Sequence, residues 1–67
     1  MELTNITKDK ITVAFSPGEL AFLSNAINEA LEAADEWEFQ TRTGETRERA
    51  VEIHAQLGEA LDEAKRT

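Results

Sequence analysis

The chain has 67 residues with seven basic and fourteen acidic side chains, which gives a formal net charge of −7. This length limits it to one small domain, and a pI near 4.5 argues against nucleic acid and anionic membranes as partners, because phosphate groups repel it. Since cysteine is absent, the chain has no disulfides, iron–sulfur clusters or zinc sites with thiolate ligands.

The first predicted element is a strand region over residues 2–15. Ile11, Val13 and Phe15 alternate with smaller or polar residues, which is typical of a strand with one buried face. The residues before them indicate a weaker first strand and a turn over 7–10, although this turn lacks the Asn-Gly or Asp-Gly pair that favours tight hairpins. We therefore expect a β-hairpin.

A helix is predicted over residues 17–34. Ser16 is placed as the N-cap, Pro17 as the first helical residue and Glu19 as the third, and together they make a capping box. Apolar residues then recur at helical spacing, as Leu20, Leu23, Ile27, Leu31 and Ala34. A second, weaker apolar stripe lies roughly opposite and comprises Phe22, Ala26 and Ala33. This helix thus has two faces to bury.

The helical spacing breaks over residues 35–45, and the sequence predicts a connection there. Trp37 and Phe39 lie in this segment. We expect both rings to fold back over the ends of the helices rather than to point into water.

A second helix is predicted over residues 46–64, capped by Thr43 or Thr46. Its apolar stripe comprises Ala50, Ile53, Leu57, Leu61 and Ala64. The expected fold is a single small α+β domain over residues 1–67. In it, an N-terminal two-stranded β-hairpin packs on an antiparallel two-helix hairpin.

Only sixteen hydrophobic side chains larger than alanine are available besides Met1, which predicts a marginal monomer. Because no disulfide supports so small a core, self-association is the usual remedy, and a homo-oligomer such as a homodimer is expected. The N-terminal segment has no basic start followed by an apolar run, and no stretch has the length of a membrane span. These features predict a cytoplasmic chain.

Signals for enzymatic chemistry are sparse. His54 is the single histidine, and its neighbours one helical turn away include no carboxylate that would orient it, so we interpret it as a packing residue. The carboxylates form neither a calcium loop nor a Glu-x-x-His motif. The sequence therefore predicts a non-enzymatic chain without catalytic residues, metal or cofactor. A small enzyme or ligand carrier that uses His54 or the arginine cluster described below is a weaker alternative.

Acidic charge is concentrated in the middle of the chain. No lysine or arginine occurs between residues 11 and 41, a span that contains six acidic residues: Glu19, Glu29, Glu32, Asp35, Glu36 and Glu38. One interpretation is steering of a basic partner. The alternative is internal pairing with Arg42, Arg47 and Arg49. These arginines also surround a predicted helix N-terminus, where a phosphate or carboxylate would bind.

Two motifs resemble a group of small uncharacterised bacterial proteins. They are S-P-G-E-L-x-x-L-x-N-A-x-N-E-A over residues 16–30 and E-F-x-T-R-x-G over 38–44. The resemblance implies a bacterial source and a helical hairpin after a short strand region, and it transfers no catalytic residue. By analogy with other small proteins of this kind, an immunity or antitoxin role follows.

The predicted function is a non-enzymatic, acidic protein-interaction module for a neutral or basic partner protein. Its sharper form is an immunity-like or antitoxin-like inhibitor of a basic protein, and the alternative is a homo-oligomeric accessory or structural protein. Aromatic side chains would anchor the partner and carboxylates would steer it. The predicted interaction surface comprises Phe22, Glu29, Glu32, Asp35, Glu36, Trp37, Glu38, Phe39 and Arg42.

Overall fold

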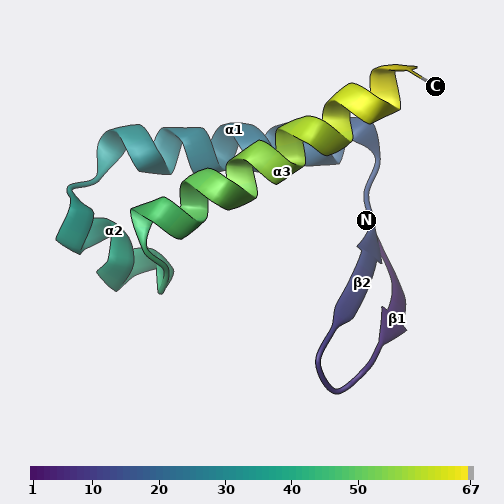
Figure 1. The fold of residues 1–67 in the computed structure, drawn as a ribbon, viewed down its shortest axis with the longest axis horizontal. Coiled ribbons are helices and arrows are strands. Elements are labelled where there is room, and N and C mark those ends of the chain that lie inside the picture. Colours follow the sequence, from purple (N-terminus) through teal and green to yellow (C-terminus); the bar gives the residue numbers. More distant parts are fainter. Residues whose placement is uncertain (67) are drawn as a thin grey trace.

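The computed structural model describes residues 1–66, which form a two-stranded antiparallel sheet and three helices. The strands β1 (Glu2–Ile6) and β2 (Ile11–Ala14) are followed by the helices α1 (Pro17–Ala33), α2 (Glu36–Thr43) and α3 (Arg47–Arg66). Figure 1 shows α1 and α3 as an antiparallel pair, with α2 at one end and the β-hairpin at the other. The predicted α+β class is confirmed.

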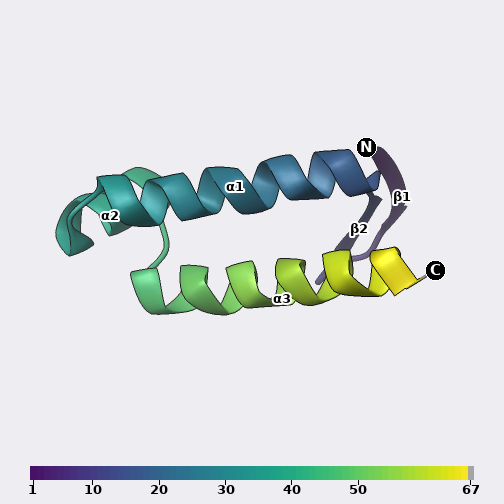
Figure 2. The same ribbon diagram turned by 90° about the horizontal axis from the view of Figure 1, so that it is seen from above.

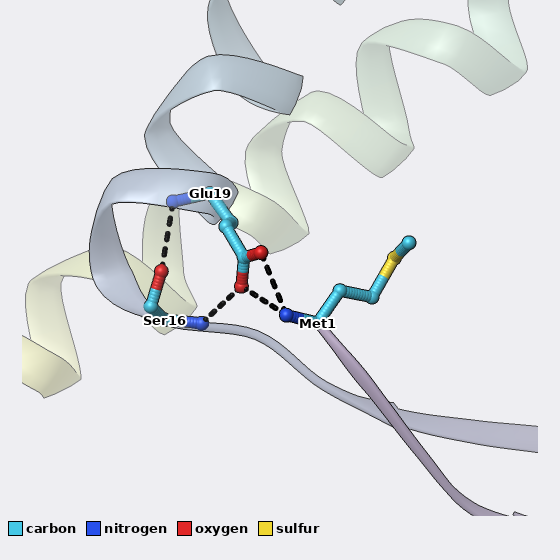
Figure 3. Close-up of polar contacts among 3 residues, drawn as sticks. All are labelled: Met1, Ser16 and Glu19. Carbon is cyan, nitrogen blue, oxygen red and sulfur yellow. Dashed lines mark hydrogen bonds and ion pairs between the residues drawn. The ribbon is translucent and has the colours of Figure 1, made fainter.

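The helix α1 begins where the capping residues predict. Ser16 Oγ accepts a hydrogen bond from the Glu19 backbone N–H (3.2 Å), and the Ser16 N–H donates to the Glu19 carboxylate (2.9 Å). The same carboxylate accepts two hydrogen bonds of 2.6 Å from the N-terminal ammonium of Met1 (Figure 3). These bonds tie the start of β1 to the first turn of α1.

The prediction of a plain connection over residues 35–45 is wrong, because this segment contains α2. The backbone of Asp35 is extended at the N-cap, Glu38 pairs with Arg42 one turn later (3.2 Å), and Gly44 ends the helix in the left-handed region at φ 79°. Acidic residues in the first turn also suit the helix dipole. Eight residues are too few for an apolar period to be visible in the sequence.

The core lies between α1 and α3 and is small. Phe39, Ala50 and Ser24 are buried, and Phe39 is only 3% exposed. The predicted stripes of α1 and α3 face each other but stay half-buried, as Leu20, Leu23, Ile27, Leu31, Ile53, Leu57 and Leu61. Among the described residues, no large side chain is fully buried. The two long helices therefore share a thin apolar seam.

The β-hairpin forms as predicted, but it does not pack on the helical pair. Every residue of β1 is exposed, and in β2 only Val13 is half-buried. Figures 1 and 2 show the hairpin projecting from one end of the helices. Only Phe15 and Ser16 separate β2 from α1, and the backbone of Ser16 is extended (φ −71°, ψ 157°) where it enters the helix.

Candidate interaction surfaces

The structure places the predicted interaction residues in three different environments. Glu29, Glu32, Asp35 and Glu36 are exposed around the end of α1 and the start of α2, and no ion pair to another described residue engages them. Glu32 accepts one long hydrogen bond of 3.4 Å from the Asn28 side chain. These carboxylates are thus available to a partner.

The two aromatic residues of α2 have opposite surroundings. Trp37 is 70% exposed, whereas Phe39 is 3% exposed. Our expectation that both rings fold back over the helices holds for Phe39 and is wrong for Trp37. Residues two apart on a helix are separated by about 200°, so one ring faces α1 and α3 while the other faces solvent. Trp37 is available as an anchor and Phe39 belongs to the core.

Phe22 lies apart from this cluster. It is 70% exposed on α1, seven residues before Glu29, which corresponds to about 10 Å along the helix. The predicted surface therefore divides. We call Glu29, Glu32, Asp35, Glu36 and Trp37 the acidic end. Phe22 belongs to a separate apolar region.

The three arginines of the predicted cluster are engaged within the protomer. Arg42 pairs with Glu38, which is half-buried, and Arg49 pairs with Glu52 (3.0 Å). Arg47 donates to the Ala34 carbonyl at the end of α1 (3.0 Å), and its guanidinium carbon lies 5.7 Å from the centroid of the Phe39 ring. This arrangement favours internal pairing over an anion site.

Arg47 makes a structural contact that the sequence did not reveal. It caps a carbonyl left open at the end of α1, and it covers the ring of the main core residue. The atom that accepts this hydrogen bond is a backbone oxygen 13 positions away. A pattern of side chains in the sequence cannot predict a bond to such an atom. Arg47 therefore holds α1, α2 and α3 together.

Residues 1–66 show three further features that bear on chemistry: the surroundings of His54, the grouping of potential metal ligands and the character of the helices. His54 is half-buried on α3, and its side chain has no hydrogen bond or ion pair with another described residue. No group of three or more acidic, histidine or cysteine side chains in this part of the chain is arranged to hold a metal ion. None of its helices combines the length and apolar character needed to cross a membrane.

Two adjoining hollows with apolar linings lie along α1, and the sequence indicated them only in part. One, of about 420 Å³, is lined by Met1, Phe15 and Phe22 together with the first turns of α1. The other, of about 270 Å³, lies between α1, α2 and α3 and includes Phe39 in its lining. They share Leu23, so they are continuous along α1. The alternation of Ile11, Val13 and Phe15 with smaller residues was the one feature of the sequence that placed Phe15 on an apolar surface.

Comparison of the chain with protein-family models, with curated proteins and with solved structures gives no match. The function is therefore inferred from the acidic end and the two hollows of this chain.

Proposed function

We propose that the chain is a non-enzymatic protein-interaction module that binds a basic partner protein through its acidic end. The observation that carries the proposal is an indole ring, 70% exposed, in the same stretch of chain as four exposed carboxylates, none of which forms an ion pair with another described residue. Exposed tryptophan is the residue type most enriched among the anchors of protein interfaces, and unpaired surface charge accelerates the approach of an oppositely charged partner.

The position of the charges supports this use. Glu29 and Glu32 lie in the last two turns of α1, where the helix dipole disfavours negative charge, and the last turn has no basic residue to offset them. The neighbouring arginines do not neutralise the acidic end. Arg47 binds a backbone carbonyl and Arg49 pairs with a glutamate of α3, while Arg42 pairs with Glu38. Glu29 and Glu32 therefore keep their charge at a local cost to the stability of α1, and binding to a basic surface accounts for that cost.

The partner class that fits is a protein with a positively charged surface and a shallow pocket for an indole ring. The sharper form of the proposal is an immunity-like or antitoxin-like inhibitor that masks the basic site of another protein. It keeps the bacterial source and the cytoplasmic setting expected from the sequence, and it excludes nucleic acid and membrane as partners because the acidic end repels phosphate.

The test is affinity capture from a bacterial lysate followed by binding measurements with the purified partner. The first variant neutralises the acidic end, as E29Q/E32Q/D35N/E36Q. Its control, E2Q/D9N/E59Q/D62N, removes the same charge from exposed positions elsewhere. We expect the first variant to weaken binding at least about tenfold, mainly through slower association, and the control to have a much smaller effect.

The anchor is tested separately with Trp37→Ala, which is expected to weaken binding by about thirtyfold, as for an interface hot spot. Binding should also weaken as salt is raised, because the steering charges are screened. Equal losses in the two neutralised variants, or capture that yields no basic protein at low salt, would refute the proposal.

A further inference from the structure

The β-hairpin has an apolar face that the other described residues leave largely exposed. Leu3 pairs with Val13 and Ile6 pairs with Ile11 across the antiparallel strands. A bulge between Leu3 and Asn5 adds one residue to β1, so Leu3 and Ile6, although three residues apart, come to the same face as Ile11 and Val13. Leu3, Ile6 and Ile11 are 56–66% exposed. An isolated two-stranded hairpin is marginal in water unless such a face is packed.

The apolar surface continues from the hairpin onto α1. Phe15 follows Ile11 and Val13 in the alternation, and it lines the 420 Å³ hollow together with Met1 and Phe22. The hairpin and α2 descend from opposite ends of the helical pair on the same side (Figure 1). We call the hairpin face and the hollow beside Phe22 the apolar face.

The whole protomer exposes more surface than a compact monomer of its mass. The protomer has an accessible surface of 5489 Å², whereas a folded monomer of 7.5 kDa is expected to expose about 4,250 Å². Its radius of gyration is 13.4 Å, against about 11 Å for a compact chain of this length. The excess of about 1,200 Å² is spread over the whole protomer, and it is enough for a second copy to bury the roughly 800 Å² that each partner contributes to a standard interface.

We infer that a second copy of this chain covers the apolar face, in a two-fold dimer in which the hairpin of each protomer packs on α1 of its partner. Each copy offers both a projecting apolar hairpin and an apolar hollow, so one two-fold axis fills both hollows at once. This interface is separate from the acidic end and does not depend on the function proposed for it.

Charge favours a second copy over a basic protein on this face. The charged groups that line the hollow beside Phe22 are the N-terminal ammonium of Met1 and the Glu19 carboxylate, and they pair with each other. The hollow is therefore electrically neutral and has no group to attract a cationic partner.

In this dimer the two-fold axis is placed perpendicular to α1, so that the two copies of α1 run antiparallel and their like charges are separated. The acidic end lies at the C-terminal end of α1, a helix of 17 residues and thus about 25 Å long. When two such helices lie antiparallel, the acidic ends are at opposite ends of the dimer, well beyond the screening length of about 8 Å at physiological salt. A parallel arrangement would bring them together.

The test is sedimentation equilibrium of the full chain from about 1 μM to 1 mM, a range over which a reversible dimer changes its average mass. We expect the mass to approach twice 7.5 kDa. Phe22→Glu should raise the dissociation constant by about 100-fold or more, because it places a charge in a desolvated contact. The matched control is Val51→Glu, which alters a 55% exposed position on α3 outside both hollows and should leave the dissociation constant unchanged.

A cross-linking experiment tests the arrangement without disturbing the apolar contact by charge. Because the chain has no cysteine, single cysteines placed at Ile11 on the hairpin and at Ala26 on α1 are unique. A mixture of Ile11→Cys and Ala26→Cys chains should form a mixed disulfide on oxidation, whereas Ile11→Cys with Val51→Cys should not. Circular dichroism of Phe22→Glu at matched concentration distinguishes loss of the dimer from loss of helix.

The inference is overturned if the wild-type chain stays at one protomer mass over the whole range, if it forms a trimer or larger ring, or if Val51→Glu dissociates it as strongly as Phe22→Glu. Salt distinguishes this inference from the proposed function. Self-association through the apolar face should not weaken as salt rises from about 50 to 500 mM, whereas binding of a basic partner at the acidic end should. The E29Q/E32Q/D35N/E36Q variant should still dimerise.

Discussion

Replacing Phe39 with alanine should remove a large part of the stability of this protein. Phe39 is the most buried large side chain among the described residues, at 3% exposure, and Arg47 lies over its ring. A buried phenylalanine truncated to alanine costs about 3–5 kcal/mol, and the lost cation–π contact adds about 0.5–1 kcal/mol. The ring borders an open hollow, so water can enter the space that it leaves, and we expect a total of about 3 kcal/mol.

This loss is large relative to the total free energy of unfolding. A chain of 67 residues has a free energy of unfolding of about 3–10 kcal/mol at typical values per residue. Phe39→Ala should therefore keep only about 0–7 kcal/mol of this free energy, and its urea midpoint should fall well below that of the wild type. The assay is urea denaturation followed by far-ultraviolet circular dichroism, at matched protein concentration.

The control for this prediction is Trp37→Ala, which truncates another aromatic residue of α2 at 70% exposure and should cost less than about 0.5 kcal/mol. Phe39→Leu keeps most of the apolar volume and should lose less than about 1.5 kcal/mol beyond the cation–π contact. If Phe39→Ala and Trp37→Ala reduce the free energy of unfolding equally, the assignment of Phe39 to the core is refuted.

Three further predictions concern acid stability and two glycines. Hydrogen bonds from the N-terminal ammonium and from the Ser16 backbone lower the pKa of Glu19 from 4.5 to about 2, so this contact stabilises the fold fully above pH 4.5, and the contribution disappears as the pH falls through 2. Urea midpoints measured between these limits should lose this part of their pH dependence in Glu19→Gln, and an unchanged profile would contradict the contact. Gly44→Ala should destabilise the protein by about 1 kcal/mol because φ is 79° there. Gly58→Ala should stabilise it by about 0.5–1 kcal/mol, since an added Cβ on α3 has open space; thermal melts that show the same sign for both would refute this assignment.

Features that depend on neighbouring residues were predictable from the sequence. Ser16, Pro17 and Glu19 determine the start of α1 through hydrogen bonds and φ preferences within one turn, and the structure has the helix beginning at Pro17. Thr46 caps α3 in the same way, since its hydroxyl accepts a hydrogen bond from the Arg49 N–H at 3.1 Å. The alternation at Ile11 and Val13 similarly predicted β2.

Features that depend on distant residues were not predictable in this way. The helix α2 is short, and burial of Phe39 together with the bond from Arg47 to the Ala34 carbonyl adds tertiary support to its few local interactions. Without that helix, nothing in the sequence separates Phe39 from Trp37, which differ by two positions and so occupy nearly opposite faces.

By itself, the sequence determined the α+β class, the starts of α1 and α3, the apolar stripes and the concentration of acidic charge over residues 29–38, because each arises from spacing or capping within a few residues. The tertiary structure alone decided which of those surfaces stay open. The hairpin projects from the helical pair instead of packing on it, and the position of α2 buries one aromatic ring while exposing the other. Burial depends on which segments meet in space, and neither periodicity nor composition contains that information.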